Sequence, residues 1–169
     1  MATEEQTQWN IGPYINGDGP QRAGQRLTIA NRKVTKLGFW IAQYLAPAGP
    51  YYYAIRRVSD DGILVREVAG QVEELGGTNT YTEYIFVSPP TVNEEAYILV
   101  EYDGGDGTHG LYYGAQNTDV KGGEYRVTKS GANYTNITTS DMAYIYTYEE
   151  PTVPAGGGGP ANLVAAGII

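Results

Sequence analysis

Apolar residues alternate with polar or small residues along much of this chain, and this two-residue period is the feature that most constrains its fold. The period is clear at Leu37, Phe39 and Ile41, which would share one face of a strand while the residues between them point to the other face. The same period returns over 96–103 and 142–148. Successive side chains in a β-strand point to opposite faces, so every second residue can enter a core. The pattern therefore predicts half-buried strands rich in Tyr, Ile, Val and Thr.

Short turn signals separate these segments and favour an all-β fold. The chain has 23 Gly and 9 Pro in 169 residues, and helix interiors tolerate neither residue well. We predict a two-sheet antiparallel β-sandwich, or a barrel, of eight or nine strands. A helix is the alternative over 65–75, where Val and Leu recur at near-helical spacing. The expected strands lie near 25–30, 33–45, 51–58, 62–68, 79–88, 95–103, 109–116, 123–129 and 141–149.

The chain divides into three parts. Residues 1–20 are polar and turn-rich and are expected to form an extended N-terminal arm. Residues 21–150 carry the strand signals and are expected to form the single folded domain. Residues 151–169 combine a Pro/Gly linker with an apolar C-terminal tail, which we expect to reach a neighbouring subunit.

Composition excludes several classes of function. The chain has no Cys and one His, which removes disulfides, thiolate catalysis and His-rich metal sites. A net charge of −8 disfavours nucleic acids and anionic membranes as partners. No apolar run is long enough to span a membrane, and the polar N-terminus predicts no secretion signal. Neighbouring carboxylates such as Glu73 and Glu74 would point to opposite faces of a strand, so we predict no enzymatic activity and no cofactor.

Four stretches carry a resemblance to a known family. They are VTKLGFWIAQYL at 34–45, YYYAIRRVSDDGIL at 51–64, TYTEYIFVSPPTVNEEAYILVEYDGGDG at 80–107 and SDMAYIYTYEE at 140–150. Their order resembles a widespread jelly-roll, carbohydrate-binding-module-like β-sandwich family, whose members occur in virion structural proteins and in prokaryotic surface proteins. The resemblance implies a jelly roll. It is less specific for function, because such a scaffold carries lectins, adhesins and capsid accessory proteins.

The abundant tyrosines suggest a sugar-binding face, because aromatic rings can stack on the apolar faces of pyranose rings. The alternative is that the 16 Tyr serve the core and subunit interfaces. A glycan site also needs polar groups beside the rings. The residues predicted for this face are Trp40, Tyr51, Tyr53, His109, Tyr112, Tyr113 and Gln116.

An acidic, Gly-rich turn suggests a structural calcium site. Asp103 and Asp106 lie in the sequence DGGDG and could offer carboxylate oxygens, which Ca²⁺ prefers. The segment lacks the alternating ligands of an EF-hand, and Asp and Gly are also common turn formers.

Together these features predict a non-enzymatic virion structural protein, such as a capsid decoration, head-fibre or tail-associated subunit on the virion surface. Its partners would be further copies of itself and other capsid proteins. The alternatives are an extracellular or cell-surface carbohydrate-binding module that uses the Tyr-rich face for adhesion, and a subunit of an extracellular filament assembled by tail strand addition. The residues predicted for the subunit interface are Trp9, Ile11, Tyr14, Leu163, Val164, Ile168 and Ile169.

Overall fold

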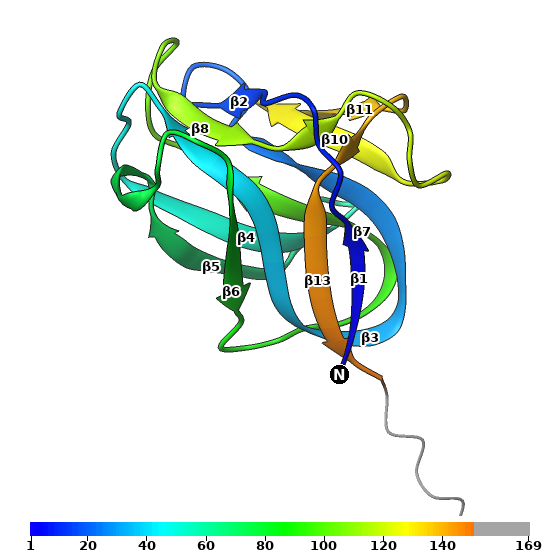
Figure 1. Ribbon diagram of the computed structural model, residues 1–169. Coiled ribbons are helices and arrows are strands. Elements are labelled where there is room, and N and C mark those ends of the chain that lie inside the picture. Colours follow the sequence, from blue (N-terminus) through cyan, green and yellow to red (C-terminus); the bar gives the residue numbers. More distant parts are fainter. Residues whose placement is uncertain (151–169) are drawn as a thin grey trace, which may run out of the picture.

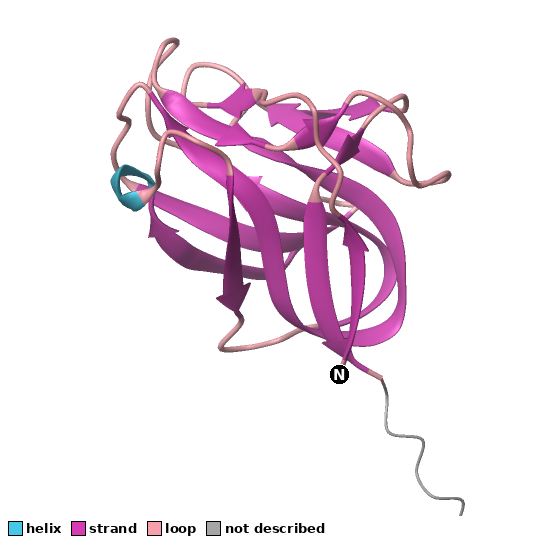
Figure 2. Ribbon diagram, viewed as in Figure 1, coloured by secondary structure: helices cyan, strands magenta, loops and turns pink. Residues whose placement is uncertain are grey.

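The computed structural model describes residues 1–150, which form antiparallel strands and one short turn of 3₁₀ helix, Val72–Glu74 (Figures 1 and 2). No helix within this range is long and apolar enough to cross a membrane. Eleven strands form one sheet, and β9 and β12 form a separate pair. The strands are β1 (Ala2–Gln6), β2 (Tyr14–Ile15), β3 (Arg22–Tyr44), β4 (Pro50–Arg57), β5 (Ile63–Gln71), β6 (Thr80–Ile85), β7 (Thr91–Glu101), β8 (Gly110–Tyr113), β9 (Ala115–Gln116), β10 (Tyr125–Ser130), β11 (Asn133–Ile137), β12 (Asp141–Met142) and β13 (Tyr144–Glu149).

Strand β3 is 23 residues long and belongs to both halves of the main sheet (Figure 1). Its beginning pairs with β7 and β10, and its end pairs with β13 on one side and with β6 and β8 on the other. The register with β7 shifts between Ile29 and Arg32, and Asn31 takes a positive φ of 50°. Such a bulge bends a strand, so β3 turns here from one half of the sheet into the other.

The two halves of the sheet face one another across one apolar core. The first half contains β11, β10, the beginning of β3, β7, β4 and β5, and the second contains β1, β13, the end of β3, β6, β8 and β2. Phe39 of the second half meets Tyr53 of the first edge to face, with ring centroids 5.1 Å apart. The Tyr53 hydroxyl also donates a hydrogen bond to the Thr82 carbonyl at 2.9 Å. These contacts hold the halves together.

Residues 1–20 do not form the predicted free arm. Strand β1 pairs antiparallel with β13 over five residues, from Ala2 opposite Tyr148 to Gln6 opposite Tyr144. Strand β2 pairs with β8, and Ile15 is buried in the main core. The first residues therefore complete the fold of their own chain, because their backbone groups find hydrogen-bond partners at free strand edges.

The remaining strand predictions are confirmed in type and differ in number and extent. The segments expected at 25–30 and 33–45 are one bent strand, and the last expected segment is divided between β12 and β13. The helical alternative over 65–75 is wrong, since residues Ile63–Gln71 pair with β4. Backbone pairing with β4 outweighs the local apolar spacing.

Candidate functional site

Three of the rings predicted for an exposed glycan face are core residues. Tyr51, Tyr53 and Tyr113 are buried. Tyr51 and Tyr53 share the inner face of β4 with Ile55, and Tyr113 points opposite to Tyr112 because the two are adjacent in β8. Burial raises the pKa of Tyr51 to about 12 and that of Tyr113 to about 12. These rings stabilise the core and cannot meet a ligand.

Trp40 and Tyr112 do lie on an outer face, that of the second half of the sheet. Tyr112 stands opposite Ala42 of β3 and opposite Tyr14 of β2, and Trp40 stands opposite Tyr81 of β6. Directly opposed residues share a face of the sheet. The rings gathered here form what we call the outer aromatic face: Trp9, Tyr14, Trp40, Tyr44, Tyr81 and Tyr112.

The rings of the outer aromatic face are packed in two groups. Trp40 and Tyr81 have centroids 4.9 Å apart. Tyr112 lies 4.5 Å from Tyr44 and 6.0 Å from Tyr14 by the same measure. Such spacings favour tilted and edge-to-face contacts.

Gly114 allows Trp9 to join this face. A Cβ at Gly114 would lie 3.1 Å from Trp9 Cγ and 3.2 Å from Trp40 Cβ, so a larger residue would displace the indoles. The Trp9 segment is held beside β8 and β9, because the amide nitrogens of Asn10 and Ile11 both donate to the Ala115 carbonyl at 3.0 Å. Trp9 remains 41% exposed.

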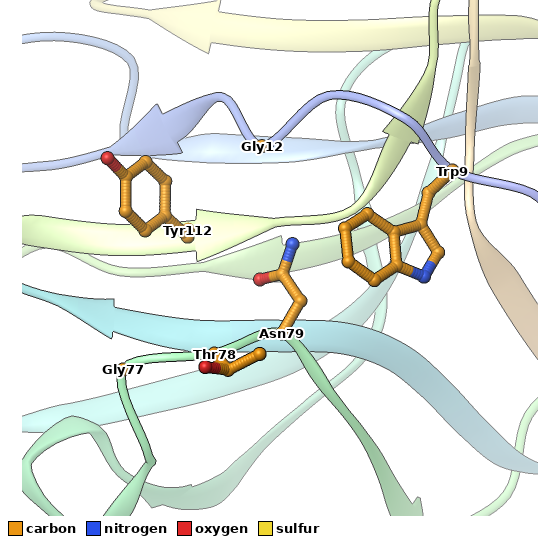
Figure 3. A pocket seen from close by; sticks show the side chains of 6 residues that line it. All are labelled: Trp9, Gly12, Gly77, Thr78, Asn79 and Tyr112. Carbon is orange, nitrogen blue, oxygen red and sulfur yellow. The ribbon is translucent and has the colours of Figure 1, made fainter.

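A pocket of about 230 Å³ opens between the two groups of rings (Figure 3). This Trp9 pocket is smaller than the roughly 300–1,000 Å³ typical for drug-sized ligands, so its size suits one small ring. Figure 3 shows the Asn79 amide between the rings of Tyr112 and Trp9. The lining residues come from three separate segments of the chain and are Trp9, Gly12, Gly77, Thr78, Asn79 and Tyr112.

The Asn79 side chain has an unused hydrogen-bonding group. Its Oδ1 is buried and accepts no hydrogen bond from residues 1–150. A buried polar atom without a partner costs about 1–3 kcal/mol and calls for an explanation. An amide also offers two N–H donors, and a half-turn about its last torsion exchanges oxygen and nitrogen. Because the Asn79 side chain lines the pocket, turning this torsion can bring an acceptor or a donor to a hydroxyl group held there.

The Trp9 pocket is uncharged. None of its six lining residues is acidic or basic. Burial, together with the neighbouring Tyr44 hydroxyl, raises the pKa of Tyr112, so its phenol stays protonated at neutral pH. The pocket combines aromatic walls with neutral amide and hydroxyl groups, which suits an uncharged polyhydroxylated ligand better than an ion.

His109 and Gln116 do not belong to this pocket. The His109 Nδ1 lies 2.7 Å from Asp106 Oδ1 in the turn before β8, and Gln116 lies in β9 opposite Asp141. The sequence proximity of these two residues to Tyr112 suggested a shared site. The turn before β8 and the short strand after it carry them elsewhere.

The two predicted calcium ligands are engaged with other groups. Asp103 pairs with Arg66 at 3.1 Å, and Asp106 Oδ1 accepts from the amide nitrogens of Thr108 and His109. These hydrogen bonds and the His109 ring hold the pKa of Asp106 well below its usual range. No group of three or more possible metal ligands occurs in residues 1–150. Asp106 acts as the cap of its turn.

The predicted interface residues divide between two regions. Trp9 and Tyr14 are exposed, and Ile11 packs against the main core beside them. All three thus lie near the Trp9 pocket. The tail segment and its predicted contacts, Leu163, Val164, Ile168 and Ile169, lie outside the described residues.

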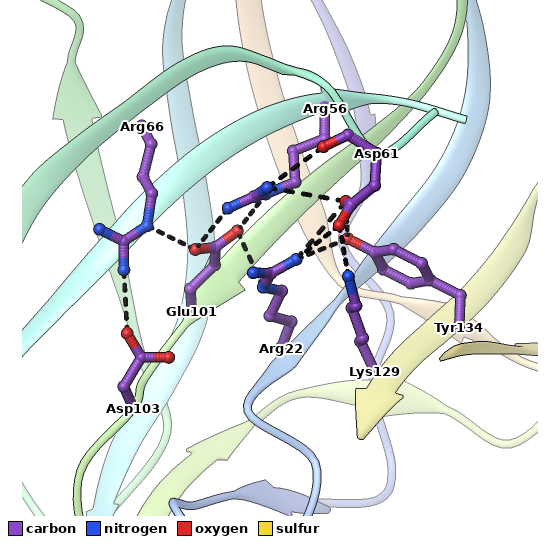
Figure 4. A network of polar contacts seen from close by, with 8 residues as sticks. All are labelled: Arg22, Arg56, Asp61, Arg66, Glu101, Asp103, Lys129 and Tyr134. Atoms are coloured by element: carbon purple, nitrogen blue, oxygen red, sulfur yellow. Dashed lines mark hydrogen bonds and ion pairs between the residues drawn. The ribbon is translucent and has the colours of Figure 1, made fainter. Parts of the chain in front are cut away.

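A cluster of polar contacts lies on the first half of the sheet and joins Arg22, Arg56, Asp61, Arg66, Glu101, Asp103, Lys129 and Tyr134 (Figure 4). Glu101, only 1% exposed, pairs with Arg56 at 2.7 Å and with Arg66 at 2.6 Å. Asp61 accepts a hydrogen bond from the Tyr134 hydroxyl at 2.8 Å and pairs with Lys129. Each of the cluster's four cations, Arg22, Arg56, Arg66 and Lys129, is paired with Glu101, Asp61 or Asp103, so these side chains are held by one another.

The sequence matches no protein-family model and no curated protein.

Proposed function

We propose that this protein is a non-enzymatic binding module that holds a neutral sugar ring in the Trp9 pocket. The observation that carries the proposal is the unpartnered Asn79 amide oxygen between two aromatic walls. A pyranose has apolar C–H faces that stack on Trp9 and Tyr112. Its hydroxyl edge supplies the donors and acceptors that an amide requires.

Isothermal titration calorimetry gives a direct test, because its signal does not depend on Trp9, the tryptophan that lines the pocket and that one variant removes. A panel of neutral hexoses and their oligomers is titrated into the wild-type protein, Trp9→Ala and Asn79→Ala. Loss of one good aromatic contact or one hydrogen bond is expected to weaken binding about threefold to tenfold. Tyr52→Ala is the matched control, since Tyr52 is a partly exposed ring on the opposite half of the sheet.

The result that contradicts the proposal is equally clear. If the wild-type protein binds no neutral saccharide, or if Trp9→Ala and Asn79→Ala bind as well as Tyr52→Ala, the Trp9 pocket is not a sugar site. Thermal unfolding of each variant shows whether a lost signal reflects a lost fold.

We also propose that the bent sheet is a jelly-roll β-sandwich. The support is the facing of its two antiparallel halves across one core, with β3 passing between them. Jelly rolls include lectin and viral capsid domains, so this fold is compatible with a binding role or a structural one.

A structural subunit of a virion is the second candidate, and exposed apolar residues favour it. Ile85, at the end of β6, is 62% exposed, and Val87, two residues further on, is 83% exposed. Strand β6 pairs with β3 on one side, and no other strand within residues 1–150 covers its second edge. Exposed apolar groups beside a free edge favour contact between subunits.

The oligomeric state of the full chain tests this second role. Light scattering during size-exclusion chromatography should find a closed oligomer for the wild-type protein and a shift toward monomer for Val87→Glu. A wild-type monomer at high concentration would contradict it. Either role is compatible with a virion surface or another extracellular setting.

A further inference from the structure

We infer that the outer aromatic face binds a neutral oligosaccharide across two subsites, with the Trp9 pocket holding one sugar ring and a second pocket beside Tyr14 holding another. This inference rests on the proposed sugar-binding function and extends it to the length and class of the ligand. The second pocket, which we call the Asp18 pocket, has a volume of about 210 Å³, nearly that of the first. It is lined by Tyr14, Asn16, Asp18, Gly19, Pro20 and Gly107.

The Asp18 pocket is built by a turn that is tied down at both ends. Asn16 Oδ1 accepts from the Gly19 amide at 2.6 Å, and the Asn16 amide donates to the Pro20 carbonyl at 2.9 Å. Across the pocket, the Gly107 amide donates to Asp18 Oδ2 at 2.8 Å. The pocket is therefore preformed, which lowers the entropic cost of binding.

One carboxylate oxygen of this pocket is available to a ligand. Asp18 Oδ1 makes no hydrogen bond or ion pair within residues 1–150, whereas Oδ2 is used by Gly107. A carboxylate accepts strong hydrogen bonds from hydroxyl donors. Asp18 is thus placed to bind a sugar hydroxyl beside the Tyr14 ring.

A continuous aromatic surface connects the two pockets. Tyr112 lines the Trp9 pocket and Tyr14 lines the Asp18 pocket, and their ring centroids are 6.0 Å apart. The Tyr44 ring lies next to both, with its centroid 4.5 Å from that of Tyr112 and 5.3 Å from that of Tyr14. A sugar chain that leaves one pocket can therefore run over these rings toward the other.

The lining chemistry selects the class of glycan. Neither pocket is lined by Lys or Arg, and the one charged lining residue, Asp18, is acidic. Uronic and sialic acids would lack a cationic partner and would meet this carboxylate. The ligand expected is a neutral hexopyranose chain of at least two units.

The test compares affinity with ligand length in the full-length protein. Neutral hexopyranose oligomers of one to six units are titrated into the wild-type protein, Tyr14→Ala, Asp18→Asn and the ring-preserving control Tyr14→Phe. We expect affinity for the wild-type protein to rise about threefold to tenfold once the chain reaches the second subsite. Tyr14→Ala and Asp18→Asn should lose this gain and keep the affinity for a single sugar, whereas Tyr14→Phe should retain most of it.

The outcomes separate this inference from the function on which it rests. If a single sugar binds but longer oligomers bind no better, or if Tyr14→Ala keeps the full gain, the second subsite is excluded while the Trp9 pocket stands. If uronic acid oligomers bind better than neutral ones, the assignment of the ligand class is wrong. If no saccharide of any length binds the wild-type protein, both the proposed function and the two-subsite arrangement fail.

Discussion

Glu101 is the single residue on which the charged outer face depends. Its carboxylate is buried and faces three guanidinium groups, at 2.7 Å from Arg56, 2.6 Å from Arg66 and 3.4 Å from Arg22. Glu101→Gln would leave these cations without their counter-charge, and breaking a buried ion pair costs about 3–5 kcal/mol. Urea unfolding should record a loss of this size.

Asp103→Asn is the control. The Asp103 side chain is exposed and pairs only with Arg66, so this substitution should cost less than about 1 kcal/mol. Equal losses would contradict the role of burial.

Asp61 should make the stability of the protein depend on acid pH. Burial acts to raise the pKa of this carboxyl, but hydrogen bonds from Lys129 and Tyr134, with the charges of Arg56 and Arg22, outweigh it and lower the pKa below its ordinary value. The unfolded chain therefore takes up the proton first as pH falls. The stabilisation is present above the unfolded pKa of about 4 and is lost as pH falls through the folded pKa.

The measurement is the urea midpoint from about pH 6 down to about pH 2.5, for the wild-type protein and Asp61→Asn. At pH 6 the urea midpoint of Asp61→Asn should lie below that of the wild-type protein. It should also fall less as the pH decreases, so the two plots of midpoint against pH converge. Parallel curves would mean that Asp61 does not supply the acid sensitivity. None of the residues that line the Trp9 pocket is acidic or basic, so affinity for a single sugar should follow only the loss of folded protein.

Single residues of the site were only partly predictable from the sequence. Trp40 and Tyr112 were predicted, whereas Asn79 has no periodic signal and follows two glycines in a turn. Its place beside Trp9 depends on how β6 and the segment before β2 meet β3 and β8. The errors at Tyr51 and Tyr53 have another cause, because a tyrosine suits either face of a strand. For Tyr113 a signal did exist, since it cannot share a face with its neighbour Tyr112.

At the scale of elements, strand type could be predicted and strand extent could not. Alternation identifies both parts of β3, but their union depends on the bulge near Asn31, where the register with β7 shifts and beyond which β13 and β6 become its partners. Strand β1 was missed for a related reason. Its sequence, ATEEQ, has little apolar character, and it is a strand because β13 offers an unpaired edge.

Strand β1 should protect β13 from association. Deleting residues 1–7 would remove the pairing partner of a Tyr-rich strand, YIYTYE, and the ion pair between Glu4 and Arg32. Unpaired, apolar strand edges template aggregation. We expect lower stability in urea and increased light scattering on warming. The control is Glu5→Gln, an exposed change in β1 that keeps the strand. A deletion variant that stays monomeric and as stable as the wild-type protein would show that β1 is dispensable.

At the scale of the whole molecule, the two outer faces are chemically opposite. The face of the first half carries ion pairs around Glu101 and Asp61, in which Arg22, Arg56 and Lys129 are held by carboxylates. The face of the second half is aromatic and carries two preformed pockets. A face braced by ion pairs and a receptive aromatic face, joined through β3, allow ligand binding on one side without cost to the stability supplied by the other.

The tyrosines also set the alkaline limit of the molecule. Burial raises the pKa of Tyr51 and of Tyr113 to about 12, and it raises that of Tyr53 as well, while unfolded tyrosines ionise near pH 10. Between these values the unfolded chain releases protons that the folded protein retains, so stability is complete below about pH 10 and falls as pH rises through the folded pKa values. Each such tyrosine contributes a loss of about 1.4 kcal/mol per pH unit in this window.

Tyrosinate absorbance at 295 nm should therefore rise in two stages, first for exposed rings and then cooperatively with unfolding. Tyr113→Phe should move the second stage to higher pH, because it removes one of the groups whose ionisation drives unfolding. A single gradual rise, with no coupled loss of the folded signal, would mean that these rings are open to solvent and that the core is not the one described.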